Sequence, residues 1–95
     1  MQKGYWVVRV SVANARNYPD YLEAARPAFA KYGARFLVRG GRYAAKEGTA
    51  RDRNVVVEFP DFDTAIACYH SAEYEAAKVI RMANAQADFI IVEGA

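Results

Sequence analysis

The first candidates for chemistry are an arginine and a glutamate on two strands predicted to be neighbours. Arg39 lies near the end of an alternating segment, residues 35–40, and Glu58 lies in another, residues 53–59. If these strands pair as a hairpin, both side chains share one face, where a fixed guanidinium could receive a ligand carboxylate. Arg9 belongs to the same face. The alternative is a structural ion pair at a subunit interface. A carboxylate clamped by arginines is a poor general base, so both interpretations favour binding over proton transfer.

A second group of polar side chains lies in the helices predicted near the C-terminus. Tyr69 belongs to a short helix, and Tyr74 and Arg81 are seven residues apart on one face of the next helix. Such side chains could close a pocket between helix and sheet, with phenol and guanidinium donors orienting a polar ligand. Alternatively, the tyrosines are core residues with their hydroxyls at the rim. The ligand-binding candidates are therefore Arg9, Arg39, Glu58, Tyr69, Tyr74 and Arg81.

Other reactive residue types are scarce. The chain has one cysteine, Cys68, and one histidine, His70, so it lacks the residues for an internal disulfide or a Cys/His zinc site. We expect Cys68 to pack as a small apolar residue and His70 to lie at the surface. No nucleophile triad, P-loop or dinucleotide fingerprint is present, and Gly40-Gly41-Arg42 lies in a predicted hairpin rather than before a helix. We expect no metal and no cofactor, and assign no catalytic residue.

Period-two alternation predicts the strands that position these side chains. The second strand is expected to pass a bulge at Gly40-Gly41 and to continue through about residue 46, with a turn at residues 47–49. The predicted strands cover residues 5–12, 35–46, 53–59 and 89–93. The apolar face assigned to the helices consists of Trp6, Val8, Val10, Phe36, Val38, Val55, Val57 and Phe59.

Caps and helical spacing predict three helical segments. Asn14 or Asn17 can cap the first, which ends at Gly33, and Pro27 should bend it without breaking it. Asp61 or Asp63 caps a short second helix, and Ser71 caps the third, which runs to about residue 84. The expected apolar stripe of the first helix is Tyr18, Leu22, Ala25, Phe29 and Tyr32.

The element order is that of a ferredoxin-like fold. Strand, helix, strand, strand, helix pair, strand is the split βαβ arrangement, an α+β fold with a four-stranded antiparallel sheet of order 4-1-3-2. We expect residues 1–95 to form one domain with the helices on one face of the sheet.

The other face of the predicted sheet has a mixed composition. It is too apolar for a freely solvated surface, and it carries charges that need partners if buried. Stacking two such faces in a homodimer answers both problems and adds buried area to a small domain. The residues of this mixed face are Tyr5, Val7, Leu37, Val56, Arg9, Arg35, Arg39 and Glu58.

Composition argues against two classes of partner. The 13 lysines and arginines are interleaved with 11 acidic residues, for a net charge of +2, and form no basic patch for nucleic acid. No apolar run approaches the roughly 20 residues of a membrane span, and the N-terminus lacks a signal-peptide core. We therefore expect a cytoplasmic protein that binds neither nucleic acid nor membrane.

Several short motifs, taken together and in order, resemble one known family. The chain is similar to the family catalogued as domain of unknown function 1330, and the resemblance implies a subunit of the dimeric α+β barrel superfamily. That superfamily includes cofactor-free monooxygenases and isomerases, haem-degrading enzymes and effector-binding domains, among which fold cannot choose. The motifs are Lys3-Gly4-Tyr5-Trp6, Pro27-Ala28-Phe29, Lys31-Tyr32-Gly33, Arg39-Gly40-Gly41, Glu47-Gly48, Val57-Glu58-Phe59-Pro60, Tyr69-x-Ser71-x-Glu73-Tyr74 and Val92-Glu93-Gly94.

Two functional hypotheses follow. The first is a homodimer that binds a small polar or aromatic metabolite in a cleft beside the sheet. An alternative within it is a cofactor-free enzyme, similar to a monooxygenase or an isomerase, that also transforms the bound metabolite. The second is a structural or interaction module without a ligand, whose mixed sheet face is wholly interface. A cavity beside the charged residues would favour the first.

Overall fold

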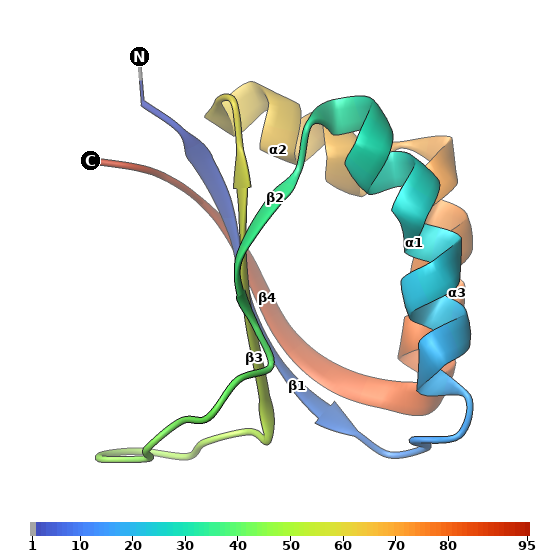
Figure 1. Ribbon diagram of the computed structural model, residues 1–95, viewed down its shortest axis with the longest axis vertical. Helices are drawn as coiled ribbons and strands as arrows, with labels where there is room; N and C mark the ends of the chain where they lie inside the picture. Colours follow the sequence, from blue (N-terminus) through green and yellow to red (C-terminus); the bar gives the residue numbers. More distant parts are fainter. Residues whose placement is uncertain (1) are drawn as a thin grey trace.

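The computed structural model describes residues 2–95, which form a four-stranded sheet with three helices on one side (Figure 1). The strand order is β2-β3-β1-β4, and every neighbouring pair is antiparallel. Counted from the opposite edge, this is the predicted order 4-1-3-2, so the ferredoxin-like fold is confirmed. The elements are β1 (Gly4–Val12), α1 (Tyr18–Tyr32), β2 (Arg35–Arg39), β3 (Arg53–Phe59), α2 (Phe62–His70), α3 (Ala72–Asn84) and β4 (Ala85–Glu93).

The core lies between the sheet and the helices. Trp6 is at its centre, with ring centroids of Tyr74, Phe59 and Phe89 at 4.8, 5.0 and 5.0 Å. Its indole N–H donates to the Ala65 carbonyl at 2.9 Å, so burial leaves no polar atom of this ring unsatisfied. We call the sheet face that meets the helices the helix side; its buried residues are Trp6, Val8, Val10, Val55, Val57 and Phe59.

The second and third helices begin with the predicted side-chain caps, whereas Asn17, at the N-cap of α1, makes no side-chain capping hydrogen bond. The Asp61 carboxylate accepts from the Thr64 amide at 2.7 Å, and the Ser71 hydroxyl accepts from the Tyr74 amide at 3.1 Å. Gly33 ends α1 with φ +68°. The helix continues through Pro27, as expected.

The buried stripe of α1 differs from the predicted one. Tyr18, Tyr21, Ala25 and Ala28 are buried, whereas Leu22 is 38% exposed. Tyr21 can be buried because its hydroxyl shares a 2.8 Å hydrogen bond with that of Tyr74. The helix therefore turns Tyr21 toward α3, and Leu22 toward the edge of the sheet.

The predicted long hairpin is wrong in its outer part. The bulge lies between Phe36 and Val38 rather than at residues 40–41, and β2 ends at Arg39. Residues 40–52 form a loop that reaches away from the sheet (Figure 1). Residues 41–50 are all exposed, because this segment has no apolar face to bury. At the other end of the chain, β4 begins at Ala85 rather than at Phe89, since alanines with low strand propensity hide its first half.

The early bulge exchanges the faces of two β2 residues. Val38 pairs with Val56, which puts it on the outer face instead of the helix side. Arg39 pairs with Val55, which puts it on the helix side instead of the outer face. No helix in residues 2–95 has the length and apolar character of a membrane span.

Candidate functional site

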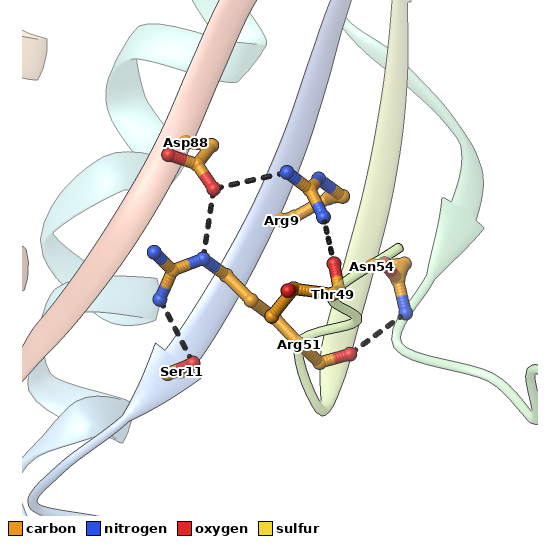
Figure 2. Close-up of polar contacts among 6 residues, drawn as sticks. All are labelled: Arg9, Ser11, Thr49, Arg51, Asn54 and Asp88. Carbon is orange, nitrogen blue, oxygen red and sulfur yellow. Dashed lines mark hydrogen bonds and ion pairs between the residues drawn. The ribbon is translucent and has the colours of Figure 1, made fainter. Parts of the chain in front are cut away.

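Of the six predicted site residues, Arg9 and Glu58 lie on the outer face. Arg9 stands directly opposite Asp88 of β4, and its guanidinium donates to that carboxylate at 3.0 Å and to the Thr49 carbonyl at 2.8 Å (Figure 2). Arg51 reaches the same Asp88 oxygen at 2.9 Å and also donates to the Ser11 hydroxyl at 2.9 Å. These bonds tie the end of the 40–52 loop to β1 and β4.

The Asp88 carboxylate responds to its two arginine neighbours. The hydrogen bond and charge of Arg51, together with the charge of Arg9, hold the pKa of Asp88 below its ordinary value of 3.8. Both Arg9 and Asp88 are solvent-exposed, so this cluster is a surface network. Its geometry explains how the loop is held and does not form a cleft.

The predicted pairing of Arg39 with Glu58 is wrong. Glu58 accepts the Tyr5 hydroxyl at 3.0 Å, and this bond raises the pKa of Tyr5. Arg39 lies on the other side of the sheet, where its guanidinium carbon is 3.9 Å from the centroid of the Phe36 ring. Arg35 is the β2 residue opposite Glu58 in the register.

An inner cavity of about 30 Å³ lies between the sheet and helices α1 and α3. A volume of this kind holds about two water-sized groups. Arg81, one of the predicted site residues, lines it from the last turn of α3 and is 4% exposed. The full lining is Trp6, Val8, Val10, Tyr18, Tyr21, Leu22, Phe29, Phe36, Arg53, Val55, Val57, Arg81 and Phe89.

A larger groove of about 340 Å³ lies beside this cavity, between α1 and β2. Arg39 lines this groove, and four residues line both spaces, so the groove and the inner cavity are adjacent. The shared residues are Leu22, Phe29, Phe36 and Arg53; the others in the groove are Pro19, Glu23, Arg26 and Arg39. We call the two spaces together the α1–β2 pocket.

Tyr74 and Tyr69 contribute to the surroundings of the pocket rather than to its lining. Tyr74 is fully buried on the same α3 face as Arg81, and it holds the hydroxyl of Tyr21, which lines the inner cavity. Tyr69 packs against the core, 6.2 Å from Trp6 between ring centroids, with the Lys78 ammonium 4.5 Å from its own ring centroid.

Buried phenols and arginines define the electrostatics of the pocket. Burial raises the pKa of Tyr21 and Tyr74, which therefore stay neutral. Burial alone lowers the pKa of Arg81, but the neighbouring phenolic oxygens, Tyr74 first, outweigh this and raise it. The inner cavity is therefore lined by neutral donors and by the cations Arg53 and Arg81.

Arg53 is the pocket residue that the sequence reasoning missed. Arg53 begins the predicted strand 53–59 and continues the period-two series Val55, Val57, Phe59 of the helix side, but the predicted face starts only at Val55. In the sheet it pairs with buried Val10, and its guanidinium carbon lies 5.6 Å from the Tyr18 ring centroid. Extending the alternation by one step would have found it.

Cys68 and His70 lie outside the pocket. Cys68 is buried on α2, and burial raises the pKa of its thiol to about 12, so little thiolate forms at neutral pH. His70 is exposed at the end of α2. Within residues 2–95 no three side chains of the His, Cys, Asp and Glu types gather as a metal site requires.

Family membership follows from the sequence of almost the whole chain. The model of the family described as Domain of unknown function (DUF1330) matches residues 3–95. The chain belongs to the DUF1330 family. None of the curated proteins matches this DUF1330 chain in sequence.

Solved structures similar to the DUF1330 chain share its fold at low identity. The RPA0582 protein of Rhodopseudomonas palustris, of unknown function, matches 96% of this chain and 81% of its own with TM-score 0.78 and 16% identity. SnoaB of Streptomyces nogalater, a cofactor-independent oxygenase, matches 97% of this chain and 92% of its own with TM-score 0.64 and 14% identity. A dimeric ferredoxin-like protein of unknown function from Thermobifida fusca matches 99% and 91% with TM-score 0.54 and 20% identity. Identities this low show the fold alone.

Proposed function

We propose that the protein is a homodimer whose subunits each bind a small organic molecule, non-covalently, in the α1–β2 pocket. The observation that carries this proposal is that the groove and the inner cavity are adjacent, with Leu22, Phe29, Phe36 and Arg53 lining both. The groove volume of about 340 Å³ falls in the range of small-molecule sites, about 300 to 1,000 Å³. Four of the eight groove residues are charged, but the two spaces together are lined by twelve aromatic or aliphatic residues and five charged ones, a composition typical of such sites.

Binding in the pocket can be measured with a neutral fluorescent probe, N-phenyl-1-naphthylamine, whose emission rises and shifts to the blue in apolar surroundings. We expect this change with the wild-type protein and its loss in Leu22→Trp. Leu22 lines both the groove and the inner cavity, so the larger side chain would fill the space where the two meet. Val79→Trp is the matched control, since Val79 is 68% exposed on α3 and outside the pocket lining. No change with the wild type, or equal binding by Leu22→Trp, contradicts the proposal.

The outer face of the sheet supports the homodimer. Its exposed apolar side chains include Val38, Ile90 and Val92, and Ile90 is 58% exposed. An uncovered apolar patch of this kind marks an interaction surface. The solved structures of similar fold include proteins described as dimeric. We assign this face to a second copy of the chain.

The dimer is tested by sedimentation velocity. We expect the wild type to sediment as a dimer and Ile90→Asp as a monomer, because a carboxylate on the buried face would lack a partner. Val79→Asp introduces the same charge on the exposed surface of α3 and should leave the dimer intact. A monomeric wild type, or a dimeric Ile90→Asp, contradicts the assignment of this face.

A catalytic role is the second candidate, because SnoaB, a cofactor-independent oxygenase, shares the fold. The inner cavity argues for binding instead, since its lining includes no Asp, Glu, His, Lys or Cys to act as a base. Oxygen consumption distinguishes the two. An electrode trace that stays flat with electron-rich aromatic compounds supports a binding protein, and uptake abolished by Leu22→Trp supports an oxygenase.

A further inference from the structure

Two arginines bring positive charge into the inner cavity without an acidic partner. Arg53 enters from β3 and Arg81 from α3, on opposite sides of the space. In each of them Nε is buried and makes no hydrogen bond. Among residues 2–95 every ion pair within 4.0 Å uses other cations, namely Arg9, Arg26, Lys31, Arg51 and Lys78. Arg81 is buried, and Arg53 is half-buried with a buried Nε. Since buried charges are ordinarily paired, these two guanidinium groups point to an anion from outside the chain.

Aromatic rings compensate these charges only in part. The Arg81 guanidinium carbon lies 5.4 Å from the Phe89 ring centroid, and that of Arg53 lies 5.6 Å from the Tyr18 ring centroid. A ring face attracts the charge of a guanidinium but accepts no in-plane hydrogen bond from its Nε–H. The rings therefore hold the two cations in place while these donors remain free.

The buried tyrosine pair supplies a further donor. Tyr21 and Tyr74 share one hydrogen bond at 2.8 Å, in which either hydroxyl can donate. The pair has two hydroxyl protons, and this bond uses one of them, so one proton is left for a second acceptor. When Tyr74 donates in this bond, the free proton is on Tyr21, which lines the inner cavity together with Arg81.

The shape of the pocket limits the anion to a small head on an apolar body. The inner cavity, about 30 Å³, has room for about two oxygen-sized atoms, and the groove of about 340 Å³ has room for a ring and a short chain. A molecule that extends from one to the other passes the rings of Phe29 and Phe36 and the side chain of Leu22. An aromatic or arylalkyl group packs well against such rings.

We propose that the α1–β2 pocket is a site for an aryl or arylalkyl carboxylate, with the carboxylate between Arg53 and Arg81 and the ring in the groove. This inference rests on the proposed binding function and specifies its ligand class. A carboxylate provides two oxygens, which can accept from the free donors of both arginines and from the Tyr21–Tyr74 pair. The amide of the same acid brings no negative charge, so it leaves the cations uncompensated.

The test compares acids with their amides. Benzoate, phenylacetate and 3-phenylpropionate are each titrated against benzamide, phenylacetamide and 3-phenylpropanamide, by calorimetry and by the fluorescence of Trp6, the single tryptophan. We expect at least one acid to bind with a Kd about ten-fold or more below that of its amide, as expected when a buried charge pair replaces a neutral contact. Arg81→Met and Arg53→Met should abolish the difference.

Arg42→Met is the matched control, because Arg42 lies in the exposed 40–52 loop and its loss changes the net charge by the same amount. If this variant also loses the preference, the effect is general electrostatics and the inference fails. It also fails if no acid binds better than its amide, or if neither arginine variant reduces the preference. If the neutral probe still binds in those cases, only the inference about an anion is refuted. If the probe does not bind either, the proposed binding function is refuted as well.

Discussion

Replacing Arg81 by methionine should remove the preference for anions with little change in the stability of the ligand-free protein. Methionine keeps the apolar length of the side chain and removes a guanidinium that is 4% exposed and has a buried, unbonded Nε. Relief of an unsatisfied buried donor is worth about 1 to 3 kcal/mol. The lost contact with the Phe89 ring, at 5.4 Å, costs about 0.5 to 2 kcal/mol. The phenolic oxygens beside Arg81, Tyr74 first, favour its charge and offset what remains, so we expect the free energy of unfolding to change by less than about 1 kcal/mol.

The assay is thermal and urea unfolding with and without phenylacetate. For a domain of this size, about 1 kcal/mol corresponds to about 4 to 8 °C in Tm, so the Tm of ligand-free Arg81→Met should lie within this interval of the wild-type value. Phenylacetate at about 100 times its wild-type Kd should stabilise the wild type by about 2.7 kcal/mol, and a variant with a ten-fold weaker Kd by about 1.4 kcal/mol.

A clear loss of stability in ligand-free Arg81→Met would refute this reasoning. A loss above about 1 kcal/mol would mean that the guanidinium is a net stabilising group whose partners satisfy it. In that event the two arginines would be structural, and the charge of the cavity would no longer indicate a ligand. Arg42→Met, at an exposed loop position, should leave Tm unchanged and controls for the altered net charge.

Three further outcomes follow from the structure. Gly40→Ala should weaken phenylacetate binding more than Gly48→Ala. Both glycines have positive φ, but a Cβ at position 40 would lie 2.5 Å from Arg53 Nη1, whereas one at position 48 meets nothing within 4 Å. Equal calorimetric Kd values for the two variants would contradict this prediction. Asp88→Asn should speed tryptic cleavage in the 40–52 loop several-fold relative to Asp52→Asn, because Asp88 holds Arg9 and Arg51. Since the folded pKa of Asp88 is lowered, its contribution to stability is complete above pH 3.8 and is lost as the pH falls through the folded pKa. A carboxyl NMR titration would follow this change. The Cys68 thiol, with a pKa of about 12, should react with a disulfide reagent at pH 8 only after unfolding, and fast reaction of the native protein would contradict its burial.

The correct predictions rest on local features of the chain. Alternation in residues 5–12 and 53–59 depends only on neighbouring side chains, and so does capping by Asp61 and Ser71. The order of elements then left one common topology. Arg81 was found as a pocket residue by the same means, since helical spacing places it on the face of Tyr74.

The errors arise where a long-range contact decides the outcome. Whether β2 bulges at residues 36–38 or at 40–41 depends on its register against β3, and a shift of one residue moves Arg39 to the other side of the sheet. The partner of Arg9 is likewise chosen by the register of β1 against β4, which brings in Asp88 from 79 residues away.

By itself, the sequence determined the fold class, the helix side of the sheet and the presence of charge on an otherwise apolar second face, because each follows from periodicity within a few residues. Only the tertiary structure decided where positive charge lacks a partner. Arg53 and Arg81 are 28 positions apart in sequence and belong to different layers, and each is unremarkable in its own segment. Folding places both against one small cavity whose other walls are apolar or aromatic, and the buried, unbonded Nε of each makes them a candidate anion site.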